Sequence, residues 1–142
     1  MYAMGQIDVE LVRKTKGSAN EMINANDRLH FQVQAKLASK LRELGEEKGR
    51  AFIEEHAPWT PFSETRPCAI LAVIHPPTNR RMDAPNWYPT IKPLIDGMTD
   101  AGVFTDDNND ILTSMTFIPG RKSKTKNYYI EIVFIEGRIF WK

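Results

Sequence analysis

The run Cys68–His75 constrains the fold more than any other part of this sequence. It reads Cys-Ala-Ile-Leu-Ala-Val-Ile-His and is stopped by Pro76 and Pro77. A nearly continuous apolar run of this length is typical of a strand that is buried on both faces. We therefore expect Cys68–His75 to be the central strand of a sheet.

Three further strands are predicted from residues that alternate between apolar and polar. They are Gln6–Val12, Ile111–Ile118 and Tyr128–Ile135, each with the period of two that a half-buried strand requires. A basic turn, Pro119–Asn127, separates the last two. We expect these two strands to pair with each other as a hairpin.

A first helix is predicted after the polar loop Lys14–Asn26. Asn26 or Asp27 is suited to cap it, and its core stripe would consist of Val33, Leu37, Leu41 and Leu44. The helix is expected to run to about Gly45 or beyond. The segment Gly49–Pro67 contains three prolines and is expected to be a connector with a short helical piece.

A second helix is predicted from the apolar residues Ile91, Leu94, Ile95 and Met98. If Thr90 is its N-cap, Pro93 falls in the first turn, where a missing N–H group is tolerated. Gly102 is suited to its C-cap. The order β, α, β, α, β, β predicts an α/β or α+β fold in which two main helices pack on a small mixed four-stranded sheet.

Length and composition favour one folded domain over residues 1–142, because 142 residues with 42% apolar side chains are enough for a core. No apolar run approaches the ~18 residues of a membrane span, and no signal-peptide pattern opens the sequence. We expect a cytoplasmic protein without membrane contact. The net charge of +1 creates no overall field that would indicate a nucleic-acid partner.

The distribution of charge is more informative than its sum. Five aspartates lie close together in the sequence: Asp96, Asp100, Asp106, Asp107 and Asp110. Cations stand on both sides of them: Arg80, Arg81, Arg121, Lys122, Lys124 and Lys126. Carboxylates flanked by cations are suited to a hard divalent ion, Mg²⁺ or Mn²⁺, that faces a phosphate backbone. The alternative is that these acidic and basic segments are solvated surface turns.

Lys92 and Asp96 are one helical turn apart and therefore project from the same side of the second helix. Asp83 and Asn86 precede this helix, and an acidic turn that includes Asp107 follows it. The two turns can therefore meet around Lys92. The alternative is that Lys92 and Asp96 form an ordinary i,i+4 ion pair beside an unrelated turn.

This part of the chain resembles the RusA family of Holliday-junction resolvases. The segments that carry the resemblance are residues 80–86 (Arg-Arg-Met-Asp-Ala-Pro-Asn), 92–97 (Lys-Pro-Leu-Ile-Asp-Gly), 101–103 (Ala-Gly-Val) and 106–107 (Asp-Asp). Residues 23–31 are similar to a segment of phage and actinobacterial-type members, so the likeness spans roughly residues 5–136.

The resemblance implies a homodimer that uses a divalent metal to nick opposing strands of a four-way DNA junction. By position, Asp83 matches the first essential aspartate of the family, Lys92 the essential lysine and Asp107 the later essential aspartate. Asp106 stands beside Asp107. Asn86, Arg80, Arg81 and the basic turn would bind the substrate.

The chain departs from the family pattern at one position. The best-known members read Asp-x-Asp-Asn, whereas this chain reads Asp83-Ala84-Pro85-Asn86, and Pro85 has no side-chain ligand for a metal. Asp96 or Asp106 would have to supply the missing charge as a metal ligand. The alternative function is a non-catalytic DNA-binding or regulatory protein on the same scaffold.

Three aromatic side chains, those of Phe31, Trp59 and Trp87, are candidates to stack on exposed bases at a branch point. Aromatic residues of this kind belong more often to a core or an interface.

Overall fold

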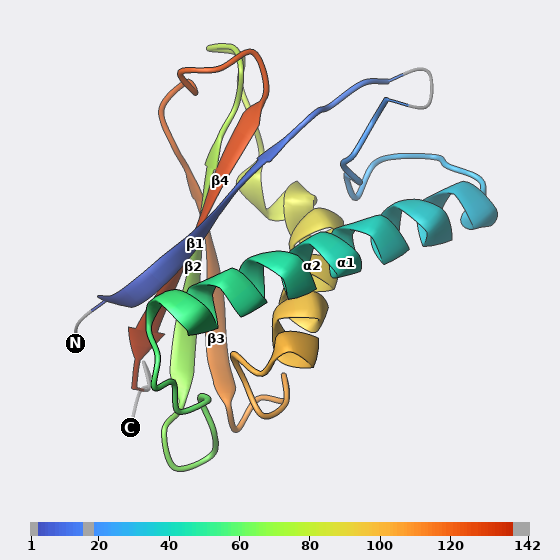
Figure 1. Cartoon of the computed structure of the whole chain (residues 1–142). Helices are drawn as coiled ribbons and strands as arrows, with labels where there is room; N and C mark the ends of the chain where they lie inside the picture. Colours follow the sequence, from blue (N-terminus) through green and yellow to red (C-terminus); the bar gives the residue numbers. More distant parts are fainter. Residues whose placement is uncertain (1–2, 16–18, 138–142) are drawn as a thin grey trace.

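The computed structural model describes residues 3–15 and 19–137. It is an α+β fold in which two helices lie on one face of a four-stranded mixed sheet (Figure 1). The elements are β1 (Ala3–Leu11), α1 (Phe31–Glu55), β2 (Cys68–His75), the 3₁₀-helix η1 (Ala84–Trp87), α2 (Tyr88–Ala101), β3 (Leu112–Pro119) and β4 (Tyr128–Glu136). The predicted fold class and the predicted order of strands and main helices are confirmed.

The sheet has the strand order β1-β4-β2-β3. β2 pairs with β3 in parallel and with β4 in antiparallel orientation, which confirms that Cys68–His75 is an interior strand. The predicted hairpin of β3 and β4 is wrong, because β2 lies between them. The most continuously apolar strand, β2, takes one of the two interior positions, where both of its backbone edges are hydrogen-bonded.

Only one face of β2 is fully covered. Ile70, Ala72 and Ile74 point toward the helices and are fully buried, whereas Leu71 and Val73 on the other face are half-buried. The prediction of burial on both faces is therefore wrong, because both helices pack on the same side of the sheet (Figure 1).

α1 begins later than predicted. Its N-cap is His30, whose ring Nδ1 accepts a hydrogen bond from the Gln32 backbone N–H at 3.2 Å. Neither Asn26 nor Asp27 caps it. The Asp27 carboxylate is engaged by the Arg13 guanidinium, with N–O distances of 2.6 and 2.8 Å, and is therefore used to hold the preceding loop.

α1 is also longer than predicted and continues to Glu55, through much of the expected connector. Its buried stripe is Leu41, Gly45, Gly49 and Phe52. Val33, which was expected in the core, is 49% exposed, because the first turns of α1 extend beyond the rest of the fold (Figure 1). Neither helix of the described chain is long and apolar enough to cross a membrane.

α2 follows η1 directly and begins at Tyr88, so Thr90 is not its N-cap and Pro93 lies inside the helix. The buried Thr90 hydroxyl instead donates to the Ile23 carbonyl at 2.7 Å and accepts from the Ile23 N–H at 2.8 Å. Thr90 thus ties the loop before α1 to α2. The predicted C-cap, Gly102, is confirmed and has a positive φ of 98°.

The two helices touch backbone to backbone at two glycines. A Cβ atom on Gly45 would lie 2.1 Å from the Leu94 carbonyl oxygen, and one on Gly97 would lie 2.0 Å from the Arg42 carbonyl oxygen. Only glycine permits this approach. The contact fixes α2, which carries Lys92 and Asp96, against α1.

Candidate functional site

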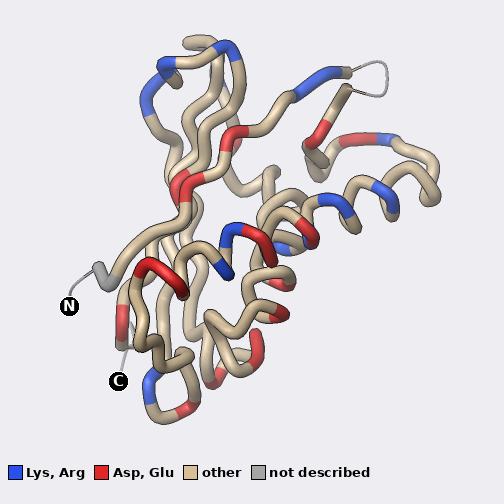
Figure 2. The backbone as a smooth tube through the Cα atoms, viewed as in Figure 1, with Lys and Arg blue, Asp and Glu red and all other residues tan. Residues whose placement is uncertain are grey.

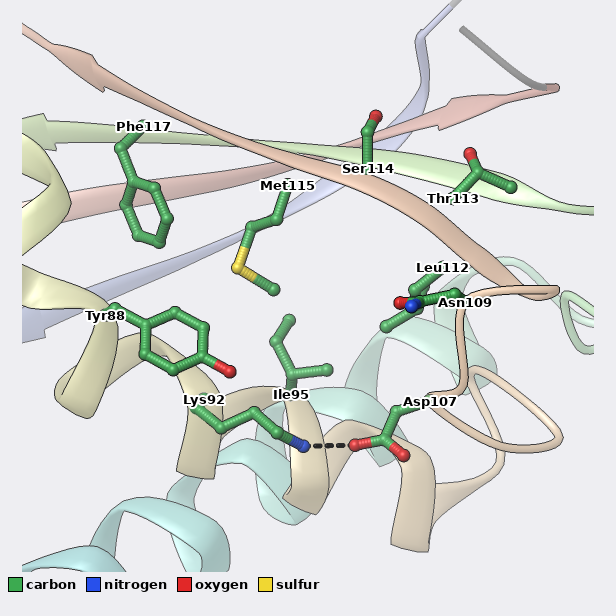
Figure 3. Close-up of a pocket in the computed structure, with 10 residues that line it drawn as sticks. All are labelled: Tyr88, Lys92, Ile95, Asp107, Asn109, Leu112, Thr113, Ser114, Met115 and Phe117. Atoms are coloured by element: carbon green, nitrogen blue, oxygen red, sulfur yellow. Dashed lines mark hydrogen bonds and ion pairs between the residues drawn. The ribbon is translucent and has the colours of Figure 1, made fainter. Parts of the chain in front are cut away.

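A hollow of about 300 Å³ lies between α2 and the edge strand β3 (Figure 3). Tyr88 and Phe117 lie toward one end of it, with their rings edge to face and the ring centroids 6.1 Å apart. Lys92 and Asp107 reach toward each other at the other end, and Met115 lies between (Figure 3). One side of the hollow is thus apolar and the other is charged.

The Lys92 ammonium stands between two carboxylates. Its Nζ donates to Asp96 Oδ1 at 2.5 Å, one turn along α2, and to Asp107 Oδ2 in the loop before β3. Partial burial acts to lower the pKa of Lys92, but the bonds to Asp107 and Asp96 outweigh it and the pKa is raised. The bond from Lys92 lowers the pKa of Asp107, against the opposing effect of burial. The Lys92 ammonium and the Asp107 carboxylate therefore both stay charged at neutral pH.

The structure brings together some of the predicted site residues and leaves others apart. Lys92, Asp96 and Asp107 converge, as expected. Asp83 is exposed at the N-cap of η1, makes no side-chain capping bond and does not line the hollow. The Asp106 carboxylate turns back onto its own loop and accepts from the Asp107 backbone N–H at 2.7 Å.

The carboxylates do not form a metal site as they stand. Among the residues described, no three His, Cys, Asp or Glu side chains are placed to hold a metal ion. Asp96 and Asp107 offer the hard oxygen atoms that Mg²⁺ and Mn²⁺ prefer, but both direct an oxygen to Lys92. Both carboxylates are therefore engaged by the ammonium, and of the expected ligands Asp83, Asp96, Asp106 and Asp107, only Asp107 lines the hollow.

The predicted substrate-binding cations lie at the other end of β3 from Asp107. They belong to the loops 76–82 and 120–127, which are joined by a hydrogen bond from Ser123 N to Pro76 O at 2.8 Å. Figure 2 shows the cations of these loops gathered at one end of the molecule. β3 has eight residues, so about 26 Å separates this end from the acidic loop. The acids and cations that alternate in the sequence are thus separate in space.

These cations line two hollows. Arg80, Arg81 and Lys126 line one of about 340 Å³ together with Arg13. Arg121, Lys122 and Lys124 line a second, of about 540 Å³, together with His75, Tyr129 and Glu131. Asn86 lies in η1, and its backbone carbonyl accepts from the Ala25 N–H at 2.8 Å. Positive charge is therefore concentrated on paired loops that face solvent.

His75, the last residue of β2, contacts the basic loop 120–127. Its protonation should change the free energy of unfolding. Its Nδ1 lies 2.8 Å from the Arg121 carbonyl oxygen and its Nε2 lies 2.9 Å from Glu131 Oε2. Burial acts to lower the pKa of His75, but Glu131, the Arg121 carbonyl and the charge of Asp8 outweigh it, so the pKa is raised. Because folding raises the pKa of His75, the protonated ring stabilises the fold. This stabilisation is complete below the ordinary pKa near 6.5 and is lost as pH rises through the pKa of the folded state.

We therefore expect the His75→Leu substitution to cost more free energy of unfolding at pH 5.5 than at pH 8.5, as measured by urea denaturation. In a Glu131→Gln background, which removes the carboxylate, the pH-dependent part of this cost should shrink. A cost that is the same at both pH values in the parent background would contradict the assigned pair.

Of the three aromatic candidates, one lies in the core and one packs against it. Trp87 is buried, and Trp59 packs edge-on against Phe52 and Phe62. Phe31 is 73% exposed. The sequence reasoning missed Tyr88, although its place four residues before Lys92 puts both side chains on one face of α2.

The sequence reasoning also missed Phe117, for which no sequence signal existed, because β3 was expected to pair with β4 rather than to form an edge beside α2.

Comparison with protein-family models finds none that matches this chain, and comparison with curated proteins finds no match. The resemblance to the RusA family therefore stays a prediction from the motif residues.

Proposed function

We propose that this chain is an endodeoxyribonuclease that cuts four-way or related branched DNA, with Lys92, Asp96 and Asp107 at the reaction site. One observation carries the proposal. Lys92 and Asp107, two residues that the RusA resemblance matches to essential positions, are fifteen residues apart in the sequence and in direct contact at one hollow. Asp96, the third member, comes from the same face of α2 as Lys92.

The charged end of the hollow has groups suited to phosphodiester hydrolysis. In that reaction water adds to phosphorus, one P–O ester bond breaks, and the departing sugar oxygen takes up a proton. The Lys92 ammonium would offset the negative charge that builds up on the phosphate. Asp107, whose lowered pKa keeps it ionised at neutral pH, would orient the water and accept its proton.

Dependence on Mg²⁺ or Mn²⁺ remains part of the proposal and comes from the resemblance. The arrangement of Asp96 and Asp107 around Lys92 does not itself provide the ligands, and we assign no reaction step to a metal. The homodimer implied by the resemblance is likewise proposed, and sedimentation of the purified protein would test it.

The cationic loops support an extended DNA substrate. Arg80, Arg81 and Lys126 on one side, and Arg121, Lys122 and Lys124 on the other, offer contacts to phosphates without reading bases. They lie about one strand length from Asp107, and about eight base pairs of duplex, at 3.4 Å each, span that distance. A duplex arm laid along β3 would therefore reach both the loops and the hollow.

One observation favours a second candidate, a DNA-binding protein without catalysis. Lys92 already forms ion pairs with both Asp96 and Asp107, and Asp83 does not line the hollow that Lys92 and Asp107 share. A scaffold that had lost cleavage would retain the cationic loops and the packing around α2.

A cleavage assay separates the two. The purified chain is incubated with a labelled four-way junction, a flap and a linear duplex of the same length, each with Mg²⁺, with Mn²⁺ and with EDTA. We expect paired nicks near the branch point with either metal and none with EDTA. Tight binding to the junction without nicks would support the second candidate, and equal cutting of linear duplex would contradict specificity for branches.

A further inference from the structure

The first turns of α1 form an exposed apolar surface. Of the large apolar side chains in the described ranges, three are exposed, and two of them, Phe31 and Val33, lie here. All six residues from Phe31 to Lys36 are exposed, and this end of α1 stands clear of the sheet (Figure 1). Burying an aromatic ring is favourable by about 1.5–3 kcal/mol, so a partner that covered Phe31 would gain this free energy.

Charge is segregated along the same helix. From Phe31 to Arg42 the helix carries three cations and no acidic residue, whereas its remaining turns carry five glutamates and only two cations, Lys48 and Arg50 (Figure 2). Arg42 is paired with Asp100. Lys36 and Lys40 are exposed, lie one turn apart and form no ion pair with any other described residue. The exposed apolar surface therefore has a cationic flank, which is complementary to a polyanion.

The root of this helix is held in place. Ile23 exchanges two hydrogen bonds with the Thr90 hydroxyl. The Ala25 N–H donates to the Asn86 carbonyl, and Asp27 is bound twice by Arg13. These contacts fix the segment before α1 to η1, α2 and the end of β1, so Phe31 is presented at a defined position.

We propose that the first turns of α1 bind DNA at an unpaired base. The Phe31 ring is stacked on the His30 ring, with ring centroids 4.7 Å apart and an angle of 28° between the ring planes, and an unpaired base can extend this stack. Lys36 and Lys40, with the exposed Arg28 before the helix, contact the adjacent phosphates. The choice of DNA as the nucleic acid rests on the proposed function, and an unpaired base is what a branch point supplies.

Two variants test the surface in the full-length chain. Phe31→Ala removes the stacking ring, and the double change Lys36→Gln with Lys40→Gln removes the two cations. The matched control is Lys48→Gln with Arg50→Gln, which removes the same charge from the acidic half of the same helix. Circular dichroism establishes that each variant is folded.

Binding is measured in EDTA, so that cleavage plays no part, with a four-way junction that carries 2-aminopurine at the branch point and with a fully paired duplex. We expect Phe31→Ala to weaken junction binding about tenfold, to abolish the fluorescence change of the 2-aminopurine and to leave duplex binding nearly unchanged. The double lysine variant should weaken binding to both and lower the salt slope of log K by about two. The control should bind like the parent chain.

The proposal is overturned if Phe31→Ala binds the junction and changes the fluorescence as the parent does. It is also overturned if the variants lose instead the binding of vesicles of acidic phospholipid, or self-association in sedimentation, with DNA binding unchanged. If the parent chain never cuts DNA but Phe31→Ala loses the fluorescence change, the binding surface on α1 is supported and the nuclease proposal is rejected. If the parent chain cuts DNA and both variants bind like the parent, the nuclease proposal is supported and the binding surface is rejected.

Discussion

Asp107→Asn should slow junction cleavage by about a hundredfold or more while junction binding changes little. Asparagine keeps the size of the side chain but cannot accept a proton or carry the charge that Lys92 now stabilises. Loss of a positioned proton acceptor costs about 10²–10⁴ in rate. The measurement is the single-turnover rate of nicking with enzyme in excess, together with the dissociation constant for the same junction in EDTA.

Asp100→Asn is the matched control. Asp100 is also on α2, but it pairs with Arg42 and does not line the hollow, so its variant should cleave normally. Asp83→Asn tests the other aspartate that the family resemblance marks. If Asp83→Asn loses cleavage, Asp83 has a role in the reaction although it does not line the hollow. If Asp107→Asn nicks as fast as the parent, the role proposed for Asp107 is refuted.

Gly97→Ala should destabilise the fold by about 3 kcal/mol or more, which is beyond the usual effect of overpacking. The new Cβ would meet the Arg42 carbonyl oxygen at 2.0 Å and the Glu46 nitrogen at 2.6 Å. Both are backbone atoms of α1, so no side chain can rotate away and the helices must separate. Urea denaturation followed by circular dichroism measures the loss.

Ser39→Ala serves as the comparison, because it places alanine at an exposed position of α1, where helix propensity favours it over serine slightly. That variant should be as stable as the parent. Gly45→Ala introduces the reciprocal clash, with the Leu94 carbonyl at 2.1 Å, and because one separation of the helices relieves both, the double variant should lose less than the sum. A Gly97→Ala protein of parental stability would show that α1 and α2 do not touch in this way.

The features predicted well from the sequence are those that neighbouring residues determine. The apolar run of β2 and the C-cap at Gly102 depend on local preferences, and the Lys92–Asp96 contact follows from helical periodicity. The pairing of β3 was predicted wrongly because it depends on β2, whose paired residues lie 44 or 45 positions earlier in the sequence. The N-cap of α1 was predicted wrongly because Arg13 takes the Asp27 carboxylate.

The candidate site was also predicted well where neighbouring residues determine it and poorly where distant parts of the fold do. The motif placed Asp107 beside Lys92 correctly, but nothing in it indicated that Asp83 would stay outside the hollow. The cations of the basic turn follow the acidic loop closely in the sequence, yet a whole strand separates them. A strand moves the chain by about 3.3 Å per residue, so closeness in sequence across β3 means distance in space.

The unequal charge of the two halves of α1 would affect how the protein is oriented when it meets a polyanion. The helix has 25 residues and is about 37 Å long, so its lysine end and its glutamate end form a large electric dipole even though the chain carries a net charge of only +1. In the field of a polyanion such a dipole experiences a torque. The torque on α1 would turn its lysine end toward the polyanion, and it would act together with the attraction of the cationic loops 76–82 and 120–127.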